Sequence, residues 1–173
     1  MSLLDIVKFP EPVLSREAEE VKDINADLEK LVMDMAETMY HAPGVGLAAN
    51  QVGIPRKIAI IDVSESDEAK NTMVLVNPRI VQASEDKDVM EEGCLSVPDF
   101  QAEVERALHV TVAAKNLKGE DVEIEASGFL ARVVQHEVDH LYGNLFIDRI
   151  GKLKRDRYVR QRKKALQKDK NLL

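Results

Sequence analysis

The sequence predicts an α+β domain in which mixed or antiparallel β-sheets surround a central helix, with a further helix at the C-terminal end. Apolar residues recur at helical spacing after Asn25 and again after Ser127, where the helix carries a His-Glu-x-x-His pattern. β-Rich runs lie between these two segments, and a basic segment follows from Lys152 onward. Strands that lie between helices of different roles favour an α+β domain.

Length and composition indicate one folded unit. The chain has 173 residues, enough to bury a core, and we expect a single domain over residues 1–173. Its 45% hydrophobic and 32% charged residues are typical of soluble globular proteins, and its single cysteine excludes an internal disulfide framework. The first residues lack the features of a signal peptide, and no apolar run reaches membrane-spanning length. We therefore expect a protein of the reducing cytoplasm.

Charge is distributed unevenly along the chain. Residues 1–150 contain 14 Lys and Arg against 29 Asp and Glu, whereas residues 151–173 contain 10 against 2. An acidic body with a basic C-terminal segment says more about function than the net charge of −7 does.

One helix is expected near the N-terminus. The first 23 residues are irregular in pattern, with turns at Pro10 and Pro12. Asn25 can cap the helix, and Pro43 with Gly44 should end it. The apolar positions that follow the helical period are Leu28, Leu31, Val32, Met35 and Met39.

The middle of the chain is expected to form the sheets. An acidic, polar loop at 64–71 separates the first two strands, and residues 116–119 are typical of a hairpin turn. A short apolar piece, 145–147, follows the second helix. The expected strands cover residues 57–63, 72–76, 80–83, 104–113 and 122–124.

The second helix carries the clearest indication of chemistry. Residues four apart lie about 40° apart around a helix, so His136 and His140 share one face and can bind one divalent metal. Glu137 beside them can hold or deprotonate a metal-bound water. Ser127 can cap this helix and Gly143 can end it. The opposite, apolar face carries Leu130, Val134, Val138 and Leu141. The alternative is a pair of surface histidines with a solvated glutamate between them.

Two histidines alone make a weak site, because a catalytic zinc-like site usually has three protein ligands and one open position. The best remaining ligand is the only cysteine, Cys94, which follows the flexible Gly93. Cys94 could instead be a buried free cysteine. His41 is a candidate fourth ligand of a closed site, and His109 reads as a surface or satisfied histidine.

The stretch from Gly44 to Gln51 matches a loose G-x-G-x-x-A pattern, but it follows a helix rather than a strand, which argues against dinucleotide binding. We interpret it as a turn leading into an extended segment that a substrate backbone can approach. Gln51 then offers a neutral amide to a developing oxyanion. The alternative is a structural turn with a solvated Gln51.

Taken together and in this order, three stretches resemble peptide deformylase: G-x-G-x-A-A-x-Q at Gly44–Gln51, E-G-C-[LI]-S at Glu92–Ser96 and Q-H-E-x-D-H at Gln135–His140. Residues 6–14 also resemble the opening of that family. The resemblance implies an α+β catalytic domain whose metal ligands are Cys94, His136 and His140. It implies one Fe²⁺ per chain, which Zn²⁺, Ni²⁺ or Co²⁺ can replace. The implied substrates are nascent N-formylmethionyl peptides, from which formate is released.

The same resemblance assigns roles around the metal. Glu137 would accept the proton of the attacking water and deliver it to the leaving amine. The Gln51 side chain and the backbone N–H of Leu95 would hold the oxyanion. Gly46 would meet the substrate backbone, and methionine would enter an apolar pocket near Val45, Leu95 and Val133.

Three arginine positions bear on this pocket. Gln101 stands where some family members have an arginine, which puts any substrate contact of that arginine in doubt. Arg106 fits a structural arginine of the family. Arg132, one turn before His136, can line the pocket with its stem while its charged head is solvated.

Rival interpretations use the same residues differently. A zinc endopeptidase would need a downstream third ligand, for which Asp148 is the only conceivable residue. A structural metal module would close the site with His41. A third alternative is a non-enzymatic RNA-binding factor that uses the basic tail. We expect residues 152–173 to form a mostly solvated basic helix that docks on the ribosome, with no role for a membrane or DNA.

Overall fold

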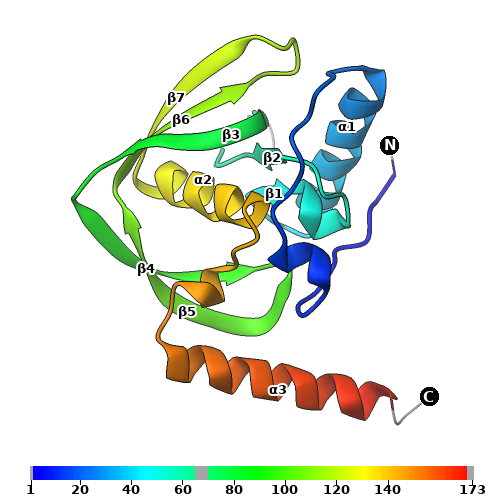
Figure 1. Ribbon diagram of the computed structural model, residues 1–173, viewed down its shortest axis with the longest axis vertical. Coiled ribbons are helices and arrows are strands. Elements are labelled where there is room, and N and C mark those ends of the chain that lie inside the picture. The colour runs from blue at the N-terminus through cyan, green and yellow to red at the C-terminus, as the bar shows by residue number, and fades with distance from the viewer. Residues whose placement is uncertain (1, 65–69, 171–173) are drawn as a thin grey trace.

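The computed structural model describes residues 2–64 and 70–170, so the middle of the expected acidic loop, residues 65–69, lies outside the described residues. Figure 1 shows helix α2 (Gly128–Leu141) at the centre of the molecule with strands on two sides of it. Helix α3 (Lys152–Lys170) lies beneath, on the side away from helix α1 (Ala26–His41). The predicted α+β fold, with a central and a C-terminal helix, is confirmed. Within the described ranges, no helix is long and apolar enough to cross a membrane.

One sheet has five strands in the order β1-β2-β3-β6-β7, with every neighbouring pair antiparallel. The turn expected between its last two strands is confirmed, because Asn116 and Gly119 are hydrogen-bonded across it and Gly119 has φ +79°. The strands are β1 (Gly46–Ala48), β2 (Ile58–Ile61), β3 (Met73–Ala83), β6 (His109–Lys115) and β7 (Asp121–Ser127).

Strand β3 differs from the prediction of two separate strands at 72–76 and 80–83. Asn77 and Pro78 lie between the two expected strands, and β3 continues through them with shifts in its register against β6. Asn77 takes φ +51°, and its side-chain amide exchanges two hydrogen bonds with the backbone of Val21. The irregular N-terminal segment therefore supplies the support that lets the strand pass an unfavourable dipeptide.

A two-stranded hairpin forms the other sheet, from β4 (Lys87–Cys94) and β5 (Val97–Ala107). The single strand expected over 104–113 is wrong, because the chain turns at Leu108, whose backbone bonds to Asp86 and Gly128, and its two halves join different sheets. Strand β4 was not expected at all. Most of its side chains are exposed, so its sequence carries too few apolar residues to reveal a strand.

Both predicted helices are present, and their ends have identifiable causes. The Asn25 side chain accepts a hydrogen bond from the Leu28 backbone N–H, which confirms the predicted cap of α1. Helix α2 ends at Leu141, just before Gly143 with φ +78°, as expected. Ser127, however, makes no side-chain cap; its hydroxyl pairs with His109 Nδ1 at 2.9 Å instead.

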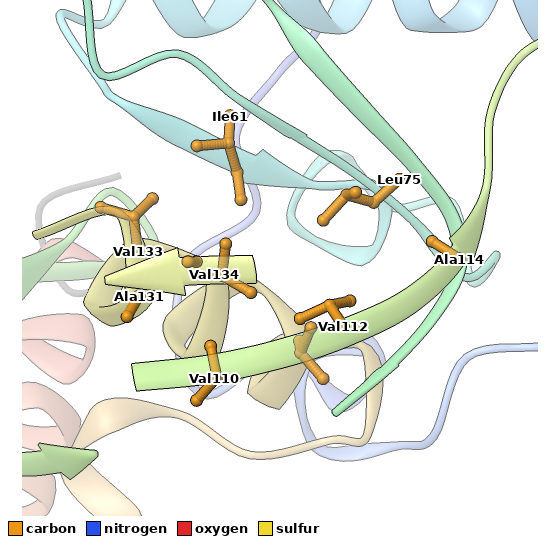
Figure 2. Close-up of a cluster of buried hydrophobic side chains, with 10 residues drawn as sticks. Ile61, Leu75, Val110, Val112, Ala114, Ala131, Val133 and Val134 are labelled. Atoms are coloured by element: carbon orange, nitrogen blue, oxygen red, sulfur yellow. The ribbon is translucent and has the colours of Figure 1, made fainter. Parts of the chain in front are cut away.

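The apolar face of α2 rests on the five-stranded sheet, as Figure 2 shows. Because this face is packed against four strands of one sheet, β2, β3, β6 and β7, the opposite histidine-bearing face is held in one orientation. The main buried residues of this cluster are Ile61, Leu75, Val110, Val112, Val133, Val134 and Val138.

A second core cluster joins the hairpin to the C-terminal helix. The short apolar piece expected at 145–147 is buried, and Phe146–Asp148 form one 3₁₀ turn. Tyr158 of α3 is only 4% exposed and belongs to this cluster. Helix α3 is therefore a basic and mostly exposed helix, as predicted, and Tyr158 anchors its first half in the core.

Candidate metal centre

Three side chains converge between the hairpin and α2. The ligand atoms of Cys94, His136 and His140 lie within 4.8 Å of one another. Cys94 Sγ is 3.3 Å from His140 Nε2, which is 3.2 Å from His136 Nε2. Cys94 comes from the end of β4 and the histidines from α2. The prediction that these three residues lie together is confirmed.

The spacing and chemistry of these atoms fit a metal ion. Metal–ligand bonds of about 2.0–2.3 Å at tetrahedral angles place ligand atoms roughly 3.3–3.6 Å apart. The two separations are at or close to this range, so these three atoms could occupy three of the four positions around such an ion. One sulfur and two imidazole nitrogens suit several first-row divalent ions.

His136 is held from behind by a carboxylate. Its Nδ1 lies 2.9 Å from Glu92 Oε2, so its Nε2 points toward the cluster. Glu92 is buried and accepts hydrogen bonds from Arg106 and Arg132. Burial opposes the negative charge, but Arg106 and His136 hold the pKa of Glu92 well below its usual range.

The arginines differ in how well the sequence predicted them. Arg106 is structural, as expected, and also donates to Asp139 of α2, which a third arginine, Arg149, contacts from the surface. Arg132 lines the cavity, as the sequence suggested for its stem, but the expectation of a solvated head is wrong. Its side chain is 6% exposed, and its guanidinium donates to Glu92 and to the backbone oxygens of Asp88 and Val104.

The surroundings shift the pKa values of the two histidines in opposite directions. Burial lowers the pKa of His136, but contacts with Cys94 and with the Glu92 carboxylate outweigh it and raise the pKa to about 10. Burial, with the neighbouring His136 and Arg106 charges, lowers the pKa of His140 well below its ordinary value. Because a ligating imidazole must be unprotonated, metal binding at this cluster releases a proton.

Glu137 lies beside the cluster in an apolar setting. It is 4% exposed, and its Oε2 is buried without a hydrogen-bond partner among residues 2–64 and 70–170. Burial raises its pKa to about 7, although the charges of His136 and Arg106 act in the other direction. A Cβ atom added to Gly46 would lie 2.4 Å from Glu137 Oε1, so only glycine leaves room for this carboxyl group.

The side chain of Gln51 also reaches the cluster of metal ligands. Its Oε1 accepts from the Ala48 backbone N–H at 2.9 Å, which fixes the amide with its nitrogen toward Cys94 Sγ at 3.4 Å and Ser96 Oγ at 3.2 Å. The extended segment expected after Gly44 is present as β1, and Gln51 lies in the 3₁₀ turn that follows it. The alternative of a solvated Gln51 is wrong, because the residue is 2% exposed.

A cavity of about 800 Å³ opens beside these side chains. Val45, Gly46, Leu95 and Val133, the residues expected to contact substrate, all line it. Gln101 lines it too, close to Gly93 on the neighbouring strand.

Residues 7–9, here called the N-terminal strap, support the same wall. Val7 N–H donates to Gln51 O at 2.7 Å and Phe9 N–H to Ser96 O at 2.8 Å. Lys8 Nζ donates to the backbone oxygen of Leu95. The strap thus holds the backbone of Gln51 and Leu95, which line the cavity, and of Ser96 beside them.

Other candidates from the sequence are not part of the centre. His41 is exposed at the end of α1, and His109 is exposed at the start of β6, so neither joins the cluster. Asp148, the conceivable ligand of an endopeptidase, pairs with the Leu145 backbone and with Arg155. The closed structural site therefore lacks His41 as a ligand, and the endopeptidase arrangement lacks Asp148.

Sequence reasoning missed the residues behind the ligands. Glu92 and Cys94 are two positions apart in β4 and therefore point to the same face of the strand, which would have indicated Glu92 had that strand been expected. Asn50, fully buried with its side-chain amide donating to His140 O, was also missed. No local pattern around Asn50 indicates this contact, which spans 90 residues of sequence.

Comparison with known proteins agrees with this geometry. The family model for polypeptide deformylase matches residues 3–156. The peptide deformylase of Rhizobium meliloti (strain 1021) is 47% identical over 165 residues, which cover 95% of each chain. The crystal structure of peptide deformylase from Ehrlichia chaffeensis superposes with a TM-score of 0.89 at 38% identity, covering 97% of this chain and 99% of that chain. A second structure of that protein, in complex with actinonin, matches with the same TM-score at 40% identity, over 95% of this chain and 98% of that one. The family model matches most of this chain, and relatives that cover nearly all of it are 38–47% identical to it. The chain therefore belongs to the polypeptide deformylase family.

Proposed function

We propose that Cys94, His136 and His140 hold the catalytic metal of this deformylase and that Glu137 moves the proton of the reaction. The chain is a hydrolase that removes the formyl group from the N-terminal formylmethionine of polypeptides and releases formate. The observation that carries the assignment of residues is the convergence of three ligand atoms beside an unpartnered, buried carboxyl oxygen in the described part of the chain.

The metal we propose is one Fe²⁺ per chain, which Zn²⁺, Ni²⁺ or Co²⁺ can replace, because one thiolate and two imidazoles accept all of these ions. When bound, the ion lowers the pKa of a coordinated water and polarises the formyl oxygen. The hydrogen bond from His136 to Glu92 keeps that ring in the orientation the ion requires.

Glu137 is the general base and then the general acid. Its Oε2 has no competing partner within the described residues and can accept the proton of the water that attacks the formyl carbon. The same oxygen then returns this proton to the methionine nitrogen as the C–N bond breaks. The proton is neither gained nor lost by the site over one turnover.

Attack on the formyl carbon places negative charge on the formyl oxygen, and this oxyanion needs fixed hydrogen-bond donors. Gln51 Nε2 and the backbone N–H of Leu95 are proposed for this role, since the amide of Gln51 is locked by Ala48 and cannot rotate its oxygen into the site. Val45, Leu95 and Val133 form the apolar surface for the methionine side chain, and Gly46 meets the substrate backbone.

We further propose that the substrates are met at the ribosome in the cytoplasm and that α3 is the docking element. The basic helix projects from an acidic body, which favours approach to ribosomal RNA without any role for a membrane or DNA. This arrangement would place the enzyme where formylmethionine first emerges.

Formate release from an N-formylmethionyl tripeptide by anaerobic, Fe²⁺-loaded protein tests the proposed assignment, with the unformylated tripeptide as control. We expect formate from the first peptide only. Wild-type protein with one metal per chain that releases no formate would contradict the proposal.

A further inference from the structure

Aromatic rings are concentrated between α3 and the metal centre. The chain has three Tyr, four Phe and no Trp, and four of these seven rings form one continuous group. The group consists of Phe9, Phe100, Phe146 and Tyr158. Figure 1 shows α3 beneath the β4–β5 hairpin. Tyr158 is the ring that α3 contributes to the group, so the group joins this helix to the hairpin.

Tyr158 packs tightly under the hairpin. Its ring centre is 4.7 Å from that of Phe100, in a stacked arrangement, and 5.9 Å from that of Phe9. Its hydroxyl donates to the backbone oxygen of Pro98 at 3.3 Å. Four residues on, Arg162 Nε donates to Phe9 O at 2.9 Å, so α3 is attached at two separate points.

Phe100 belongs both to this group and to the substrate cavity, which it lines. Its other stacking partner is Phe146, at 6.0 Å, and Phe146 in turn stacks on the His136 ring at 6.2 Å. The ring of Phe100 is thus held between α3 and the residue that packs on a metal ligand. Without Tyr158, Phe100 would keep only one of its two stacking partners.

We propose that Tyr158 is a positioning residue for the substrate cavity, which it serves by holding Phe100 in the cavity wall. Helix α3 is therefore part of the structure of the active site and not only a docking element. The proposal deepens the proposed function and rests on it. A half-buried ring that loses a stacked neighbour moves toward the space left behind, and the cavity then loses apolar surface that the peptide contacts.

The test compares Tyr158→Ala with Tyr158→Phe in Ni²⁺-loaded full-length protein, using an N-formylmethionyl tripeptide. We expect Tyr158→Ala to raise KM about three- to tenfold, with kcat and metal content within about twofold of wild type. Tyr158→Phe keeps the ring and should behave as wild type. Tyr158→Leu, which keeps most of the buried volume, serves if the alanine variant does not fold, and it should raise KM in the same direction.

Arg162→Ala is the matched control, because it removes the other attachment of α3 and leaves Phe100 untouched. It should lower the melting temperature without changing KM. The proposal is overturned if Tyr158→Ala leaves KM unchanged. It is also overturned if Arg162→Ala raises KM equally, because loosening of α3 alone would then explain the rise in KM.

Amide hydrogen exchange reports on the same contact without turnover and so separates this proposal from the proposed function. Exchange at residues 99–101 should be about tenfold faster in Tyr158→Ala than in wild type, and unchanged in Arg162→Ala. Equal exchange in all three proteins would overturn the positioning role even if formate release behaves as proposed. A wild-type protein inactive on the formyl peptide, with this exchange pattern intact, would count against the function alone.

Discussion

Glu137 and Gly46 approach each other more closely than any other residue type at position 46 would allow. The Cβ of an alanine at position 46 would lie 2.4 Å from Oε1 and 2.8 Å from Cδ of Glu137. One glycine therefore serves both the extended backbone that meets substrate and the space in which the carboxyl group sits. The sequence predicted that Gly46 meets the substrate backbone, but it did not indicate the contact between Gly46 and Glu137.

Replacing Glu137 by glutamine should leave metal binding near wild type and reduce kcat by about 10²–10⁴-fold or more, because a proton acceptor is lost while the three ligands stay. Metal stoichiometry and kcat measured on one preparation check this. Loss of metal in parallel with activity would mean that Glu137 holds the ion.

Gly46→Ala should displace the Glu137 carboxyl group and lower kcat by about 10²-fold, since a shift near 1 Å in a reacting group has an effect of that size. Metal content should not change. Gly151→Ala is the control, because its Cβ would meet nothing within 4 Å among the described residues. A Gly46→Ala enzyme with wild-type kcat would show that the carboxyl group has room to move.

The segment that follows β2 is held by one aspartate. Asp62 accepts hydrogen bonds from the Tyr40 and Ser64 hydroxyls and from the backbone N–H groups of Ser64 and Asn71. Burial raises the pKa of Asp62, but these bonds outweigh it and lower the pKa from 3.8 to about 2. The carboxylate thus joins both ends of the acidic loop to α1.

Asp62→Asn should reduce the free energy of unfolding at neutral pH by about 1.5–3 kcal/mol, the range for hydrogen bonds to a charged group. Because the pKa of Asp62 is lowered on folding, its contribution is complete above pH 3.8 and is lost as the pH falls toward 2. Urea unfolding of both proteins between pH 7 and 3 should therefore show the difference narrowing below about pH 4. A difference in the free energy of unfolding that stays constant over this pH range would contradict the role of the charge. Asp5→Asn, which changes an exposed side chain, is the control and should unfold with the same free energy as wild type.

Helices were predictable here and strands less so, for physical reasons. The caps and apolar period of α1 and α2 are local, so Asn25 and Gly143 could be read directly. The path of β3 through Asn77 depends on a contact with Val21, 56 residues away, which no local pattern reveals. The three ligands could be placed together from motifs, whereas Glu92 could not, because it required the unexpected strand β4.

The molecule as a whole is acidic except along α3. Lys163, Lys164 and Lys168 are exposed on this helix, beyond the part anchored by Tyr158 and Arg162. Deleting residues 152–173 would therefore remove core packing together with charge. Charge reversal at the exposed positions separates docking from folding.

Changing Lys163, Lys164 and Lys168 to glutamate should abolish ribosome co-sedimentation at low salt, while KM and kcat for a formyl tripeptide stay within about twofold. The control carries the same change of charge on the body, at Lys22, Arg79 and Lys118, and should still co-sediment. Unchanged co-sedimentation of the α3 variant would exclude this helix as the docking element.

The N-terminal strap is synthesised before all the residues that it contacts. The hydrogen bond from Lys8 to Leu95 O spans 87 residues, and the bond from Arg162 to Phe9 O spans 153 residues. Closing such long loops is entropically costly and slow, so these contacts should form after the sheets and α2. A growing chain that has released only residues 1–150 would hold all three metal ligands and yet lack Tyr158, which holds Phe100 in the cavity wall. We expect a newly made enzyme to gain full activity only after α3 has left the ribosome.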